Sequence, residues 1–171
     1  MLLQKHRAGR PDEVRRVVFD DFVHVVDTLR FLLDGVDGNG RGSDAVSVTA
    51  RGDERGVRRL ALQLTRGQRL AVGVMHRTTG LTQEVLEVVA DSRSRRVVDL
   101  AEVTDAVGAS CTTRRDEWVP VGVQRGFAGL AEHFLSSVRA GDVLDASDAL
   151  ATHRLCEQVV REVEAVLQPL A

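Results

Sequence analysis

Residues 45–65 read AVSVTARGDERGVRRLALQLT, and this stretch decides the fold class. Apolar side chains recur at every second residue, first at Val46 and Val48 and then at Leu60 and Leu62. A period of two predicts β-strands that bury one face and leave the other face wet or available for an interface. The short segment between the two runs is rich in Gly, Asp and Glu, so the two strands should pair antiparallel.

The same alternation continues along the chain in residues 68–78, 82–91 and 95–100, again with short turns between the runs. The pattern therefore predicts about five consecutive strands that pair as an antiparallel meander. Residues 101–123 fit either a further strand with a loop or a short helix, and both structures stay open.

Helical patterns flank this meander. Residues 19–33, FDDFVHVVDTLRFLL, place apolar side chains at a 3.6-residue spacing, with Asp20 or Asp21 as the N-cap and Gly35 just past the end. Residues 34–44 are dense in Gly, Asp and Asn and predict a loop.

Two more helices are predicted near the C-terminus. Residues 126–141 repeat Phe, Leu and Val at helical spacing before a C-cap at Gly141, and residues 146–168 begin at Ser147 as the N-cap. The order of the elements predicts an α+β fold, an open and mostly antiparallel sheet with helices packed on one face. We expect residues 1–171 to form a single domain, because this length supports one core.

Composition excludes several classes of protein. Hydrophobic residues make up 43% of the chain and charged residues 28%, which is normal for a globular domain. The net charge is −2 and basic residues alternate with acidic ones, so we expect no nucleic-acid partner. No apolar run is long enough to span a membrane and the first residues lack a secretory signal, so we expect a cytoplasmic protein with no membrane partner. Cys111 and Cys156 lack metal-ligand spacing, so no metal site is expected.

The first predicted helix carries the strongest chemical signal. Asp20, His24 and Asp27 are spaced i, i+4 and i+7, so they share one face, opposite the apolar face. Such a face is most simply a solvated surface, with Asp20 favoured by the helix dipole. However, short acids that flank an imidazole also suit general acid/base chemistry, because the carboxylates orient the ring.

At these residues the sequence resembles a known family. DDFVHVVDTLRFLLDG (20–35) is similar to the D-x-x-x-H-x-x-D helix that opens the C-terminal domain of Gfo/Idh/MocA oxidoreductases. VGVMHRTTGLTQEVLEVVADSRSRRVVDL (72–100) is similar to the family's central strands, and residues 125–160 resemble its closing helices. The three segments occur in the family's order, and the resemblance covers most of the chain from about Val17 to Val163.

The resemblance implies an open sheet whose exposed face serves oligomerisation, so a homodimer through that face is expected. It also implies that the domain binds a small-molecule substrate, often a sugar or polyol, while an N-terminal Rossmann domain transfers hydride to or from NAD(P). Carried over, Asp20 and His24 match the catalytic pair, with His24 as the acid/base. Asp27 matches the third position, with a structural or substrate-binding role.

The chain also departs from the family pattern. The family's dinucleotide loop and its catalytic lysine, in a Glu-Lys-Pro motif, belong to an N-terminal half, and Lys5 in QKHR does not match that motif. We therefore expect no cofactor in this chain. Three functions remain open: a substrate domain that needs a separate Rossmann partner, a cofactor-independent acid/base enzyme (cyclase, isomerase or lyase) that uses His24 and Asp20, and a non-catalytic dimerisation module.

Three further residues are candidates with simpler alternatives. His76 either lines a substrate pocket on the sheet or marks a strand end, and Arg125 either binds an anionic substrate or seals the edge of the core. Trp118 is expected to pack against that edge.

Overall fold

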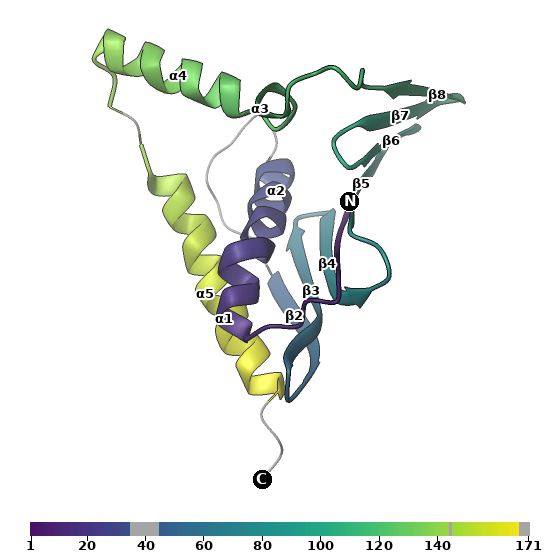
Figure 1. The fold of residues 1–171 in the computed structure, drawn as a ribbon, viewed down its shortest axis with the longest axis vertical. Coiled ribbons are helices and arrows are strands. Elements are labelled where there is room, and N and C mark those ends of the chain that lie inside the picture. The colour runs from purple at the N-terminus through teal and green to yellow at the C-terminus, as the bar shows by residue number, and fades with distance from the viewer. Residues whose placement is uncertain (35–44, 144, 168–171) are drawn as a thin grey trace.

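The structure, a computed structural model, describes residues 1–34, 45–143 and 145–167, and it has the predicted α+β architecture (Figure 1). The predicted loop 34–44 and the Gly35 cap therefore fall almost wholly outside the described residues. The strands are β1 (Leu2–Ala8), β2 (Ala45–Asp53), β3 (Gly56–Arg66), β4 (Arg69–Thr79), β5 (Gln83–Ala90), β6 (Arg93–Val98), β7 (Glu102–Val107) and β8 (Ala109–Arg114). The helical elements are α1 (Val14–Val17), the π-helical η1 (Val18–Phe22), α2 (Val23–Asp34), α3 (Val121–Gln124), α4 (Phe127–Ala140) and α5 (Ser147–Leu167).

The strands form one sheet in the order β2-β3-β4-β1-β5-β6-β7-β8. The prediction of an uninterrupted meander is wrong at one point, because β1 lies between β4 and β5. Lys5 on β1 pairs with Met75 in a parallel ladder and with Glu84 in an antiparallel ladder. The sequence hid this strand because Lys5 occupies a position where alternation calls for an apolar residue.

The segment that the sequence left open is now assigned. Residues 101–123 contribute the hairpin β7–β8, which turns at Gly108 with φ 73°, and the single-turn helix α3. Most of this segment therefore forms strands, and a short helix follows the second strand.

The first helix begins earlier than predicted. α1, η1 and α2 run without a break from Val14 to Asp34, with Glu13 at the N-cap, so Asp20 and Asp21 lie inside the helical segment and cap nothing. Because Asp20 and Asp21 do not cap the helix, their side chains are free to make other contacts. The π-helical turn matters because isolated π turns occur frequently at functional sites.

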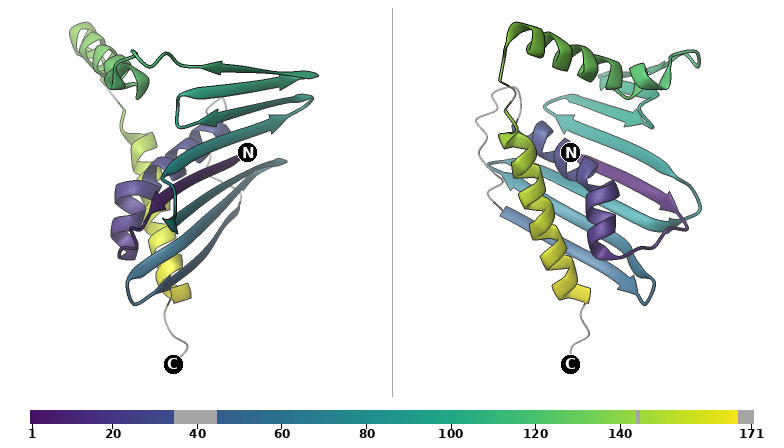
Figure 2. Two further views of the ribbon diagram at one scale, coloured as in Figure 1. Left: turned by 45° about the vertical axis from the view of Figure 1, so that its right-hand side comes forward. Right: turned by 60° about the vertical axis from the view of Figure 1, so that its left-hand side comes forward.

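The core lies between this helical segment, α5 and the first four strands of the sheet order (Figure 2). The predicted apolar stripe is confirmed at Phe22, Val26, Leu29 and Leu33, which are all buried. Helix α2 approaches β4 closely at Gly73, where a Cβ atom would lie 2.5 Å from Val25 Cγ1. No helix among the described residues covers the opposite face of the sheet, as Figure 2 shows edge-on.

The second half of the sheet is much less covered. Every residue of β8 is exposed, and along α4 only Ser137 is buried. The helix α4 ends as predicted at Gly141, with φ 76°, but its apolar stripe covers nothing in the described residues. Trp118 is 89% exposed, so the prediction that it packs against the core is wrong for this chain.

Candidate functional site

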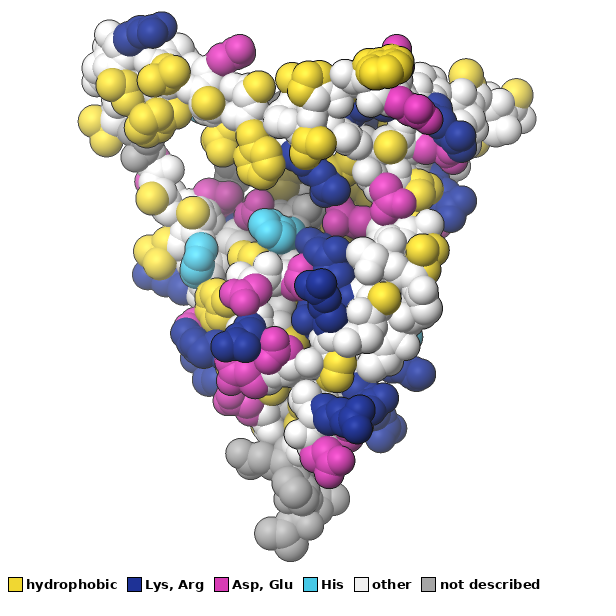
Figure 3. Space-filling view, in the orientation of Figure 1, with side chains coloured by type: hydrophobic (Ala, Val, Ile, Leu, Met, Phe, Trp, Pro, Cys, Tyr) yellow, Lys and Arg dark blue, Asp and Glu magenta, His cyan; other side chains and the backbone are white. Residues whose placement is uncertain are grey.

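The predicted catalytic face lies on the outer side of η1 and α2. Asp20, His24 and Asp27 are all exposed, as their spacing predicts. Figure 3 shows histidine side chains on this side of the molecule, over α2 and α5. Asp27 accepts a hydrogen bond of 2.7 Å from the Thr152 hydroxyl on α5, so one of the three side chains also links two helices.

Asp21 has the opposite surroundings to its neighbour Asp20. Its carboxylate faces the sheet and accepts hydrogen bonds of 2.6 Å from Arg7 on β1 and 2.6 Å from Arg77 on β4. Burial alone would raise the pKa of Asp21, but the hydrogen bonds and charges of the two arginines outweigh it and lower the pKa to about 2. Asp21 is therefore ionised at any physiological pH.

A buried lysine extends this charged cluster. Lys5 is 5% exposed, and its ammonium lies 3.7 Å from Glu84 Oε2 on β5. Burial lowers the pKa of Lys5, and the neighbouring Glu84 opposes that change. Arg77 is 6% exposed, so two cations are buried beneath the helical segment. Lys5 is paired with Glu84, and Arg77 is paired with Asp21.

Sequence reasoning missed this cluster because its members lie far apart along the chain. One signal was available: Lys5 and Arg77 interrupt the apolar alternation of their strands on the face that packs against helices. A charged residue at a buried strand position needs a partner, so such interruptions mark buried polar networks.

A shallow depression connects the cluster to the predicted catalytic face. Asp20 and Asp21 line it together with Arg77, with Arg16 on α1 and with the segment that follows β1, namely Gly9, Arg10, Pro11 and Asp12. The lining is mostly polar and charged. Side chains of this kind suit a ligand rich in hydroxyl groups or one that carries charge, and they can orient such a ligand beside Asp20.

The structure does not bring all predicted site residues together. His76 projects from the face of the sheet without helices, because its neighbours Met75 and Arg77 are buried on the helical side. Its ring lies 5.2 Å from that of His6. Arg125 follows α3 and is exposed. His76 therefore belongs to a different surface from His24.

The described residues do not enclose His24 or Asp20, so no closed pocket of the kind expected for a self-sufficient acid/base enzyme surrounds them. The one parallel pair in the described sheet joins β1 to β4, with two strands between them in sequence, so no β–α–β nucleotide-binding unit forms. Within the same residues, no group of three or more His, Cys, Asp or Glu is placed to hold a metal ion. No described helix has the length and apolar character needed to cross a membrane.

Comparison with known proteins gives a consistent result. Residues 1–106 match the family model described as YceM-like, C-terminal domain. The chain is 28% identical over 166 residues to YceM of Salmonella typhimurium, whose name places it among the oxidoreductases. That match covers 94% of this chain and 52% of the relative, so the chain spans about half the length of its curated relative.

Solved structures share the fold. A Gfo/Idh/MocA family oxidoreductase from Vibrio cholerae superposes with a TM-score of 0.78 at 22% identity, over 94% of this chain and 52% of the other. A dehydrogenase from Clostridium difficile gives a TM-score of 0.82 at 19% identity, over 95% and 54%. The chain therefore belongs to the YceM-like C-terminal domain family, and it shares its fold with about half of a Gfo/Idh/MocA family oxidoreductase.

Proposed function

We propose that this chain is the substrate-binding and oligomerisation domain of a Gfo/Idh/MocA-like oxidoreductase, and that it needs a nucleotide-binding domain outside these residues for hydride transfer. In this role His24 moves a proton as the acid/base and Asp20 orients the imidazole. Asp27, tied to Thr152, positions the helix that carries them. A Rossmann-type partner supplies the nicotinamide.

The observation that carries the proposal is an apolar surface beside the predicted catalytic face. On α4, Phe127, Leu130, Phe134 and Val138 form one stripe, and each is more than half exposed. Figure 3 shows apolar side chains over α3 and α4 on the same side of the molecule as the histidines. An apolar surface of this extent usually marks a protein interface.

Helix α4 has little support from the other described elements. A helix of 14 residues has marginal stability alone in water, and α4 contacts mainly α3 among the described elements. The relatives are about twice as long as this chain. A second domain that covers α4 would lie next to His24 and Asp20, and it would complete a site that this chain leaves open.

The proposal is tested with a chimera in which the N-terminal half of Salmonella YceM precedes residues 1–171, compared with the isolated chain. We expect NADH fluorescence to report binding to the chimera alone, and hydrogen exchange to show that α4 gains protection there. Phe134→Glu should remove that protection, whereas Ser136→Glu on the opposite side of α4 should retain it. Equal exchange of α4 in the chimera and the isolated chain would contradict the proposal.

The same chimera tests the role of His24 with a panel of sugars and polyols. His24→Ala should lower turnover by about 10²–10⁴-fold, the usual contribution of a general acid/base. His153→Gln, a second exposed histidine on α5, is the matched control and should keep the activity. Turnover by the isolated chain without nucleotide would instead favour a cofactor-independent acid/base enzyme.

We also propose that the sheet face without helices forms a homodimer. Over β1–β4 the middle of this face presents small, apolar and uncharged polar side chains, namely Leu2, Gln4, Ser47, Thr49, Ala61, Gln63, Val72 and Val74. Depletion of charge is typical of interface cores. Val74→Glu should give a monomer in sedimentation experiments, whereas Val107→Glu on β7 should leave the dimer intact.

A further inference from the structure

A row of basic side chains crosses one end of the open sheet face. Arg51 on β2 pairs with Arg59 on β3, Arg59 pairs with His76 on β4, and His76 pairs with His6 on β1. Directly paired residues project from the same face, so the four side chains lie next to one another across four strands. We call Arg51, Arg59, His76 and His6 the basic row.

The basic row lacks neutralising partners. Within residues 1–34, 45–143 and 145–167, the side chains of Arg51 and Arg59 make no ion pair or hydrogen bond, whereas Arg7 and Arg77 on the other face are held by Asp21. His6 Nδ1 is buried and lacks a hydrogen-bond partner in the same residues. Like charges placed directly opposite one another destabilise a sheet, so this arrangement calls for an anion.

Beyond the ion pair between Asp53 and Arg58 at the β2–β3 end, the groups that surround the basic row are mostly uncharged. Gln83 on β5 pairs with His6 beyond the end of the row, and Gln4 and Thr78 flank the histidines along β1 and β4. On this face the nearest acid of β5, Glu87, lies opposite Arg96 on β6 and is displaced along the strand from His6. On β2 the carboxylate of Asp53 lies two residues after Arg51 on the same face, but it is already engaged by Arg58 and by the backbone N–H of Arg55.

There is also room above the row. Arg51, Arg59 and His76 line a shallow depression together with three small neighbours, Thr49, Ala61 and Val74. The three neighbours have short side chains, whereas the basic side chains are long. A small group that carries negative charge can therefore rest on the sheet and reach two guanidinium groups and an imidazole.

We propose that the basic row is a binding site for the oxyanion of a small ligand, a phosphate or carboxylate group held by Arg51 and Arg59 and by the imidazole of His76, with His6 adding a further imidazole beside His76. Guanidinium groups bind such oxyanions through paired N–H donors. The site lies on the opposite face of the sheet from His24 and does not depend on the role proposed for His24. It shares Thr49, Ala61 and Val74 with the surface proposed for the homodimer.

The histidines make this site sensitive to pH. Burial lowers the pKa of His76, and the charges of His6 and Arg59 lower it further, so the imidazole is mostly neutral at neutral pH and gains its proton as the pH falls. A bound anion favours the protonated imidazole. By linkage, the anion therefore binds more tightly as the pH falls.

The test uses sulfate, whose charge is constant between pH 6 and pH 8, and measures thermal unfolding of the full chain at matched ionic strength. We expect sulfate to raise the unfolding midpoint more at pH 6 than at pH 8, and sodium chloride to fail to reproduce the effect. Arg59→Gln should weaken the apparent affinity at least about tenfold, which corresponds to about 1.4 kcal/mol. Arg96→Gln, on the same face but opposite Glu87, is the matched control and should leave it unchanged.

Two further experiments test the role of His76 and the class of anion. His76→Gln should keep sulfate binding at pH 8 and remove the increase at pH 6. Acetate in place of sulfate distinguishes a carboxylate ligand from a phosphate-like one, since a site built for a tetrahedral dianion responds to sulfate alone. An equal sulfate response in the Arg59→Gln and Arg96→Gln variants, or a response that sodium chloride reproduces, would overturn the proposal.

Discussion

Asp20 and Asp21 are adjacent in the sequence and differ completely in their surroundings. Asp20 is exposed on the predicted catalytic face, whereas Asp21 accepts hydrogen bonds from Arg7 and Arg77 on the sheet. The exposed positions of Asp20, His24 and Asp27 were predictable, because a helical period fixes which side chains share a face. The partners of Asp21 were not, since they come from strands about 14 and 56 residues away.

This contrast gives the first prediction. Asp21→Asn should lower the free energy of unfolding by about 3 kcal/mol, because it leaves Arg77 buried without a counter-ion. Asp20→Asn is the matched control and should change stability by less than about 0.5 kcal/mol, as expected of an exposed site. Urea unfolding at pH 7 measures both changes, and equal stabilities of the two variants would show that the arginine pair contributes nothing.

The pH dependence of the same residue follows from linkage. The pKa of Asp21 is about 2 in the folded protein and 3.8 in its ordinary state, so its stabilising contribution is complete above about pH 4–5 and is lost as the pH falls towards 2. The unmodified protein should therefore lose about 2 kcal/mol more than Asp21→Asn over this range. Parallel pH profiles for the two proteins would contradict this assignment.

At the scale of elements, periodicity found the strands β2–β6 and all the long helices, because each presents a regular apolar side. It missed β1, where a buried lysine replaces an apolar residue, and it could not reveal that β1 separates β4 from β5. Strand order depends on pairing between distant segments, and local patterns carry no record of it.

The contact between α2 and β4 yields a prediction at this scale. At Gly73 an added Cβ would lie 2.5 Å from Val25 Cγ1 and 2.9 Å from Leu29 Cδ1, both on α2. Gly73→Ala should therefore destabilise the protein by about 1–3 kcal/mol through overpacking. Gly80→Ala, where nothing lies within 4 Å, is the control and should be nearly neutral. Calorimetric unfolding compares the two, and a neutral Gly73→Ala would mean that α2 sits farther from the sheet.

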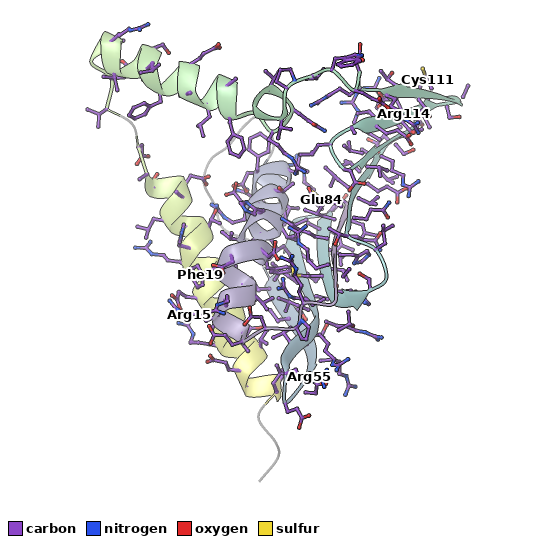
Figure 4. The ribbon with its side chains drawn as sticks, viewed as in Figure 1. Arg15, Phe19, Arg55, Glu84, Cys111 and Arg114 are labelled. Carbon is purple, nitrogen blue, oxygen red and sulfur yellow. The ribbon has the colours of Figure 1, made fainter. Side chains whose placement is uncertain are left out.

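The molecule as a whole divides into a well-covered part and an exposed part. Helices α2 and α5 bury the strands β2, β3, β4 and β1, whereas β6–β8 and α4 have few buried side chains (Figure 4). Figure 4 illustrates the contrast: Arg15 and Phe19 stack beside α5, while Cys111 lies at the far end of the sheet. The sequence predicted that helices cover one face of the sheet, but it could not show how little of the sheet they cover.

This division predicts a gradient of local stability in the isolated chain. Amide hydrogens of β3, β4 and α2 should exchange only through global unfolding, whereas those of α4 and β8 should exchange orders of magnitude faster, because little burial opposes their opening. Hydrogen exchange with mass spectrometry measures this at low protein concentration. Protection of α4 equal to that of α2 in a monomeric sample would show that the apolar stripe is already covered.

The central position of β1 has a consequence for synthesis in the cell. The ribosome releases Leu2–Ala8 before either partner strand has been synthesised. Lys5 therefore lacks its partner residue until Glu84 on β5 has been added. At typical translation rates this delay is roughly 4–16 s. The nascent chain therefore exposes both edges of β1 until β4 and β5 have been synthesised, and an unpaired strand edge of this kind is open to pairing with another chain.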